Sequence, residues 1–176
     1  MIIWPLAFAL GAVSVNASFV SAAAPEVASE YQLKAAFLYN FAKFIDWPAK
    51  TFSAANTPFT ICVLGADPFG ADLEQTIKNQ TLGGREIVIR RLKRPPEREA
   101  CQIAFISGSE KESVGQFLST LKNASVLTVS EFDSFTQLGG MINLYLEENR
   151  VRFEINVAPA ENAGLRISSK LLKLAK

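Results

Sequence analysis

The chain has 176 residues, 49% hydrophobic and 20% charged, which is enough apolar material for one domain with a core and excludes a disordered chain. Its 18 lysines and arginines nearly cancel its 17 aspartates and glutamates, so charge predicts neither nucleic-acid binding nor attraction to an anionic membrane. Histidine is absent, which excludes serine–histidine catalysis and histidine-ligated metal sites. The composition favours a protein that is not an enzyme and needs no cofactor, with carboxylate or lysine chemistry left as the alternative.

The first 24 residues are predicted to direct export. They carry no charged side chain and end in small residues, as the apolar core and cleavage region of a secretory signal do. Because Pro25 would obstruct cleavage after Ala24, we expect cleavage after Ala23, which makes residues 1–23 a signal peptide. The alternative is an uncleaved anchor, since about 20 apolar residues can span a bilayer. Polar side chains weaken that alternative: Ser14, Asn16, Ser18 and Ser21.

An amphipathic helix is predicted from Ser29 to Ile45, with Ser29 as its N-cap. Its apolar stripe consists of Leu33, Phe37, Phe41 and Phe44. Lys34 lies off this stripe. Pro48 ends any helical continuation and holds Trp47 extended, which should leave Trp47 partly exposed beside a chain reversal. The stripe is typical of core packing, and a partner-binding surface is the alternative.

A strand, a turn and a helix are predicted next. The apolar run from Phe59 to Leu64 is typical of a strand buried on both faces of a mainly parallel sheet. Gly65 allows a tight turn, and Asp67 is placed to cap a helix from Pro68 to Asn79. A pair of glycines then breaks the chain before a second strand from Arg85 to Leu92.

After a charged surface loop over residues 93–99, the pattern repeats. Cys101 to Ser107 is predicted as another buried strand, followed by a small-residue turn and a helix from about Glu110 to Lys122. Ser125 to Val129 supplies a further strand. This repeated strand–helix–strand order predicts an open α/β sheet with right-handed crossovers.

The C-terminal part adds an antiparallel edge. Glu131 to Leu138 is predicted as a short helix. Met141 to Glu147 and Arg150 to Asn156 alternate as two strands joined by a tight turn, which predicts a hairpin. A turn at residues 159–162 and a closing helix from Ile167 to Leu174 complete the chain.

One domain is therefore predicted over residues 29–176, since no internal repeat or interdomain linker is present. The predicted fold class is α/β. We expect an open mixed sheet with helices on both faces, mainly parallel and carrying an antiparallel C-terminal hairpin.

Cys62 and Cys101 are predicted to form a disulfide, because in an oxidising compartment such a pair is more often bridged than free. Their predicted strands would be neighbours in the sheet, which makes close approach of the α-carbons plausible. Closing a loop of about 40 residues would stabilise the fold by about 3–4 kcal/mol in the chain-entropy model. Two buried thiols are the alternative.

Two turns at strand ends form the candidate ligand site. Ligands of open α/β sheets bind outside the C-terminal ends of the strands, and the turns at Gly65–Gly70 and Ser107–Ser109 could offer N–H groups to an anion. The simpler interpretation is that both turns only connect strands to helices, with Asp67 as a cap. Arg166 could hold a carboxylate or phosphate beside Ser168, whose simpler role is to cap the last helix.

A charged strip on the second hairpin strand is the candidate partner-binding site. Arg150, Arg152 and Glu154 alternate along one face of this strand, so they should share that face. A solvated edge is the simpler interpretation, and a protein-contact strip is the alternative. Trp47 and Phe69, which we expect to be exposed, complete the predicted partner surface.

Several blocks of sequence carry a resemblance to a known family: KAAFLYNFAKF, ICVLGADPFG, VLTVSEFDSFTQLGGMI, NRVRFEIN and AGLRISSKLLKLA. They occur in order over roughly residues 31–175, together with the Cys62-to-Cys101 spacing. On these blocks the chain resembles the YfiR family, periplasmic proteins that restrain a membrane-bound diguanylate cyclase.

The resemblance implies a periplasmic α/β protein, often a homodimer, that binds the periplasmic sensor region of a diguanylate cyclase and lowers cyclic di-GMP and biofilm formation. An outer-membrane lipoprotein would remove the repressor under envelope stress. Cys62 and Cys101 match the main disulfide positions of the family, whereas a further cysteine pair of some members is missing here. The alternative function is that of a periplasmic small-molecule-binding protein or weak enzyme that uses the two strand-end turns.

Overall fold

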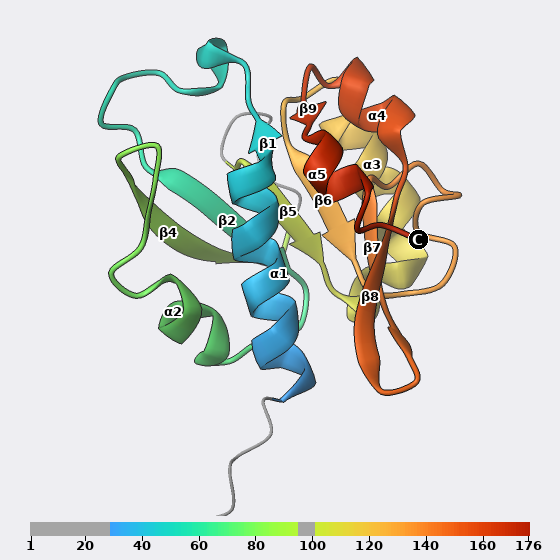
Figure 1. The fold of residues 1–176 in the computed structure, drawn as a ribbon. Helices are drawn as coiled ribbons and strands as arrows, with labels where there is room; N and C mark the ends of the chain where they lie inside the picture. Colours follow the sequence, from blue (N-terminus) through green and yellow to red (C-terminus); the bar gives the residue numbers. More distant parts are fainter. Residues whose placement is uncertain (1–28, 95–100) are drawn as a thin grey trace, which may run out of the picture.

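The structure, a computed structural model, describes residues 29–94 and 101–176 and is organised around a seven-stranded sheet with the order β3-β4-β2-β5-β6-β7-β8 (Figure 1). The strands of this sheet are β2 Phe59–Leu64, β3 Thr81–Leu82, β4 Arg85–Leu92, β5 Ile103–Ile106, β6 Leu127–Ser130, β7 Ile142–Glu147 and β8 Arg150–Ile155. A small second sheet pairs β1 Ile45–Asp46 with β9 Arg166–Ile167. The helices are α1 Glu30–Phe44, η1 Ala49–Thr51, α2 Asp72–Ile77, η2 Gly108–Ser113, α3 Val114–Leu121, α4 Val157–Asn162 and α5 Ser169–Leu172.

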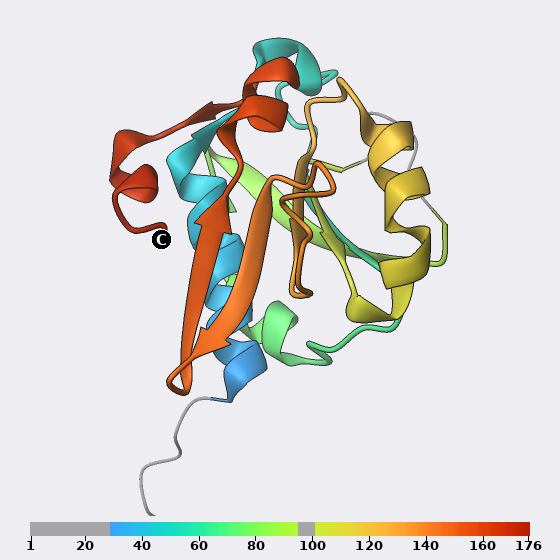
Figure 2. The ribbon, with the colours of Figure 1, turned by 90° about the vertical axis from the view of Figure 1, so that its right-hand side faces the viewer.

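The predicted fold class is confirmed. Strands β4, β2, β5, β6 and β7 run parallel, while the β7–β8 hairpin closes one edge antiparallel and β3 closes the other. The sheet curls into a half-barrel, with α1 on one side and α3 on the other (Figure 2).

The sequence of strand β2 is a continuous apolar run because both faces of this central strand are buried. Its side chains alternate between the two faces, so that Ile61 and Val63 pack in the core beneath α1, whereas Cys62 and Leu64 pack in the core beneath α3. All of its residues are buried. The predicted bounds of β2 and β4 are confirmed.

Helix α1 begins and ends close to the predicted residues. Ser29 is the N-cap of a capping box, in which its hydroxyl accepts a hydrogen bond from the Gln32 N–H at 3.1 Å. The prediction for its buried face was partly wrong, because Leu33 is exposed and Lys34 is only 4% exposed. The buried face also includes Ala35, Leu38, Phe41 and Ala42. The buried face of α1 therefore contains small alanines and a lysine with acidic partners, and it does not coincide with the predicted stripe of large apolar side chains.

The helix predicted from Pro68 is shorter than expected, since α2 begins at Asp72. Asp67 does not cap it. Its carboxylate instead accepts a hydrogen bond from the Phe69 N–H at 2.8 Å, which closes a local turn. Gly70 then adopts a φ of 54°, which interrupts helical backbone before α2 starts.

Two predicted helices on either side of β6 also differ. The helix expected from Glu110 begins as the 3₁₀ segment η2 and becomes α-helical only at Val114. The segment from Glu131 to Leu138 forms consecutive turns rather than a helix. Ser134 has a φ of 70°, and a left-handed residue cannot continue an α-helix.

The C-terminal predictions were partly wrong. The predicted turn at residues 159–162 lies within α4, where Pro159 is tolerated because it stands in the first turn. The predicted closing helix is divided, since Ile167 pairs with Ile45 in the β1–β9 ladder before Ser168 caps the short helix α5.

The hairpin prediction is confirmed. The strands β7 and β8 are joined by Glu148 and Asn149, whose φ values of 50° and 58° are those of a two-residue turn of the hairpin type. Strand β3, which pairs with β4 across the glycine pair, was not predicted. The predicted signal peptide and residues 95–99 of the charged loop lie outside the described residues.

Gly140→Ala is expected to lower the free energy of unfolding by about 1–3 kcal/mol, because overpacking a core forces neighbours to move. A Cβ at Gly140 would collide with the ring of Phe135, which is fully buried and packs edge-to-face on Phe132. Urea unfolding would measure the change. Gly115→Ala in α3 is the control, since nothing lies within 4 Å of its Cβ position and alanine should stabilise that helix by about 0.5–1 kcal/mol. Equal shifts for both variants would contradict the packing argument.

Candidate functional site

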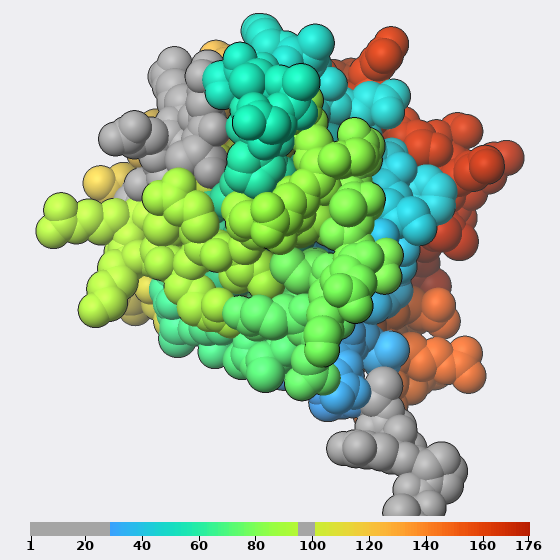
Figure 3. All heavy atoms as spheres, turned by 90° about the vertical axis from the view of Figure 1, so that its left-hand side faces the viewer, coloured from blue at the N-terminus to red at the C-terminus, as the bar shows by residue number. Residues whose placement is uncertain are grey.

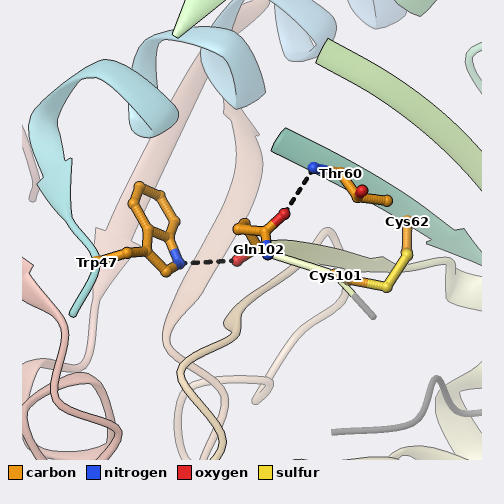
Figure 4. Close-up of a disulfide and its surroundings, with 5 residues drawn as sticks. All are labelled: Trp47, Thr60, Cys62, Cys101 and Gln102. Atoms are coloured by element: carbon orange, nitrogen blue, oxygen red, sulfur yellow. Dashed lines mark hydrogen bonds between the residues drawn. A yellow bond between two sulfur atoms is a disulfide. The ribbon is translucent and has the colours of Figure 1, made fainter. Parts of the chain in front are cut away.

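A disulfide joins two central strands of the sheet and confirms the predicted pairing. Cys62 in β2 and Cys101 just before β5 are both fully buried, with their α-carbons 5.9 Å apart. The buried side chain of Gln102 continues this connection, since its Oε1 accepts a hydrogen bond from the Thr60 N–H at 2.6 Å (Figure 4). The start of β5 is therefore fixed to β2 by a covalent bond and by hydrogen bonds.

Trp47, which follows β1, contacts the start of β5 beside the disulfide. Its indole Nε1 donates a hydrogen bond to the Gln102 carbonyl oxygen at 3.2 Å, and its ring packs edge-to-face on Phe59 (Figure 4). As predicted, the side chain is partly exposed. It borders a groove of about 440 Å³ that Phe52 and Arg85 also line, where the end of α1 and the β3–β4 turn meet on the face shown in Figure 3.

The charged strip on β8 has the predicted alternation. Arg150, Arg152 and Glu154 share one face of the strand, while Val151 and Phe153 are buried on the other face against α1. Glu154 accepts a hydrogen bond from the Thr136 hydroxyl at 2.7 Å. Within the described residues Arg150 forms no ion pair, so an exposed cation stands at the tip of the hairpin.

Glu147 forms ion pairs with two cations at this hairpin. Lys176 Nζ contacts its carboxylate, and Arg152 Nε lies 3.4 Å from its Oε2. These cations, Lys176 foremost, hold the pKa of Glu147 below its usual value. The neighbouring outer face is concave and includes Tyr145, whereas the half-exposed Leu146 pairs with Val151 and lies on the opposite face. The hairpin therefore presents a mixed charged and apolar surface at an edge of the sheet.

The predicted partner residues do not form one surface. Phe69 was expected to be exposed and is 3% exposed, because it packs edge-to-face on Phe105 at 4.7 Å and on Tyr31 at 5.8 Å. Trp47 lies beside the N-terminal residues of β2, whereas the hairpin tip lies at the opposite end of the sheet (Figure 1). Phe69 is a core residue, and Trp47 is separate from the hairpin arginines.

The structure brings the two strand-end turns into contact with one another. The Ala66 N–H donates to Ser109 Oγ at 3.0 Å, and the Ser109 N–H in turn donates to Ser107 Oγ at 3.4 Å. A Cβ at Gly65 would lie 2.5 Å from Ser109 Oγ, so this side chain fills the space beside the glycine. The polar groups of the turns therefore bind one another.

Arg91 is a residue that the sequence did not single out. Its guanidinium donates to Asp67 Oδ2 at 2.6 Å, to Glu74 Oε1 at 2.5 Å and to the Gly70 carbonyl oxygen at 2.9 Å. The hydrogen bond from Arg91 lowers the pKa of Glu74. Asp67 thus serves as an ion-pair partner that holds the turn against β4.

Lys34 forms a buried ionic cluster at the same end of the sheet. Its Nζ donates to Glu131 Oε2 at 2.6 Å and also pairs with Glu30. The Tyr31 hydroxyl donates to Glu131 Oε1 at 3.4 Å. Burial and the negative charge of Glu131 raise the pKa of Tyr31. The cluster joins α1 to the segment after β6.

The C-terminal ligand candidates lie apart from the strand-end turns. Arg166 is exposed, with Nη2 4.0 Å from Asp46 Oδ2. Ser168 Oγ accepts a hydrogen bond from the Lys170 N–H at 3.2 Å, which is the capping role expected for it. A ligand at these residues stays a prediction.

A comparison with protein families decides where this fold belongs. Residues 31–176 match the family model described as YfiR/HmsC-like, which is nearly the whole described domain. The chain belongs to the YfiR/HmsC-like family. No curated protein matches the chain. The resemblance noted in the sequence is therefore confirmed at the level of the family.

Two further observations describe this member of the YfiR/HmsC-like family. None of the helices in residues 29–94 and 101–176 combines the length and apolar character needed to cross a bilayer. In the same residues, no three side chains among aspartate, glutamate and cysteine are grouped so that they could hold a metal ion. The domain thus combines a disulfide-linked core, a charged hairpin and polar turns that bind one another.

Proposed function

We propose that this chain is a periplasmic regulatory protein that represses a membrane-bound diguanylate cyclase by binding its periplasmic sensor region. The match to the YfiR/HmsC-like family over residues 31–176 carries the proposal. Members of this family act as regulators rather than catalysts, so repression would depend on a contact surface and not on a reaction. Cyclic di-GMP and biofilm formation would fall when the protein is bound.

Two observations support a periplasmic location. Residues 1–23 have the composition of a secretory signal, with no charged side chain and small residues at the end. The Cys62–Cys101 disulfide needs an oxidising compartment to form and persist. Release by an outer-membrane lipoprotein, and assembly as a homodimer, belong to the same proposal through the family resemblance.

The β7–β8 hairpin is the surface we assign to the cyclase. An edge strand with alternating charges can orient a partner, and Arg150 is exposed without an ion-pair partner among the described residues. Arg152 and Glu154 continue the strip, and Tyr145, which pairs with Arg152, adds a partly exposed aromatic ring on the same face. A partner with acidic groups facing Arg150 would complement this surface.

Charge reversal on the hairpin tests the assignment. In a host that lacks the gene, complementation with Arg150→Glu is expected to leave cyclic di-GMP high, whereas Lys78→Glu should repress like the wild type. Lys78 is a matched control because it is also an exposed cation without an ion pair among the described residues, at the end of α2. Immunoblots of the periplasm would show equal protein. Full repression by Arg150→Glu would show that the contact lies elsewhere, whereas failure of the wild type to repress would overturn the proposed function itself.

A further inference from the structure

A groove on the α3 side of the sheet has the features of a small-molecule site. It has a volume of about 430 Å³ and lies between α3, the segment that leads into β7, and α4. Figure 2 shows α3 beside this segment, on the side of the sheet away from α1. Ligand pockets typically have volumes of about 300–1,000 Å³, so the groove is large enough for a small organic molecule.

Apolar side chains stand on two walls of the groove. Leu118 lines it from α3, and Leu138 lines it from the opposite wall, with Met141 and Pro159 beside it. Leu138 is 54% exposed, although its backbone is fixed by a hydrogen bond from its N–H to the Ser134 carbonyl oxygen at 3.0 Å. Because Leu138 shares this concavity with Leu118, Met141 and Pro159, the groove offers a contiguous apolar wall of the kind that ligand pockets have.

The charge of the groove is provided by a single residue. Lys122, at the C-cap of α3, is the one charged side chain among the lining residues, and it forms no ion pair within residues 29–94 and 101–176. Asn123 and Asn162 add amide groups near it. A lysine at a helix C-terminus also interacts favourably with the helix macrodipole, and this interaction requires no ligand. The experiment therefore needs a second C-terminal helix lysine as its control.

We propose that this groove binds a small amphipathic carboxylate. The apolar chain lies between Leu118 and Leu138, and the carboxylate pairs with Lys122 at the mouth of the groove. The site is separate from the strand-end turns at Gly65–Gly70 and Ser107–Ser109, and it goes beyond the proposed repression.

Calorimetric titration with three probes of equal chain length tests the proposal. Octanoate is expected to bind saturably, 1-octanol more weakly, and octyltrimethylammonium most weakly of the three. Lys122→Gln should weaken octanoate binding about two- to fivefold, as expected for a partly exposed ion pair, and should leave 1-octanol binding unchanged. Leu138→Ser should weaken both.

The chain offers matched controls. Lys173 is an exposed C-cap lysine of α5, and Leu174 is an exposed leucine outside the groove, so Lys173→Gln and Leu174→Ser should bind octanoate like the wild type. Thermal unfolding would show that all variants are folded. Absence of saturable octanoate binding would overturn the proposal. Equal binding of the ammonium probe, or equal losses in the control variants, would overturn it too.

Discussion

Cys62→Ser is expected to lower the free energy of unfolding by about 3–4 kcal/mol. The disulfide closes a loop with a sequence separation of 39 residues, and a cross-link of this span removes conformational entropy from the unfolded chain. Both cysteines are fully buried between β2 and β5, so the serine hydroxyl also enters an apolar environment. Urea unfolding at fixed pH would measure the loss.

Cys62→Ser leaves Cys101 as a free thiol, whereas the double variant Cys62→Ser/Cys101→Ser has no thiol. Comparing the two separates the loss of the disulfide from any effect of the free thiol. The double variant should be at least as unstable as the single variant, because either change removes the same bond and Cys101→Ser buries a second hydroxyl. The wild type in a strong thiol reductant should move toward the same midpoint. An unchanged midpoint in all three experiments would contradict a stabilising role for the disulfide.

Glu131→Gln is expected to lower the free energy of unfolding by about 3 kcal/mol, at the low end of the range for broken buried ion pairs. The change removes the acceptor of the short hydrogen bond from Lys34 and leaves that ammonium buried, with the partly exposed Glu30 as its remaining partner. Lys34→Met/Glu131→Gln should recover most of the loss, since no unpaired charge is then buried. A double variant that is less stable than Glu131→Gln would contradict this account.

The same cluster predicts a dependence on alkaline pH. Burial lowers the pKa of Lys34, but hydrogen bonds to Glu131 and Glu30 outweigh burial and raise its pKa above the usual value. A raised pKa on a cation contributes stability that is complete below the unfolded value, about 10.4, and is lost as pH rises through the folded value. Tyr31, whose pKa is also raised, acts in the same direction. Unfolding measured from pH 8 to 11.5 should show a smaller alkaline loss for the double variant than for the wild type.

Local patterns were sufficient for the longer strands of the main sheet, but not for the two-residue strands β3 and β9. The apolar run of β2, the glycine break before β4 and the two-residue hairpin turn are short-range signals, and the structure confirms them. The short helices were less predictable, because a turn closed by Asp67 and a left-handed Ser134 interrupt otherwise helical patterns. Isolated helices of four to eight residues such as α5 and α3 depend on tertiary packing.

The missed residues depend on distant partners. Lys34 reads as a solvated helix lysine, and only the fold brings Glu131, 97 residues away, into contact with it. Phe69 reads as an exposed turn residue, but the turn folds beneath α1 and buries its ring against Phe105. Pairing of this kind leaves no periodic signal in one sequence. The hairpin strip was predictable because strand alternation alone places its charges on one face.

The most direct test of the proposed repression is the concentration of cyclic di-GMP in the native host, with and without the gene. Deletion should raise cyclic di-GMP, and the wild-type gene supplied in trans should lower it again. A gene that lacks residues 1–23 should fail to complement, because the protein would stay in the cytoplasm. Unchanged cyclic di-GMP on deletion would contradict the account.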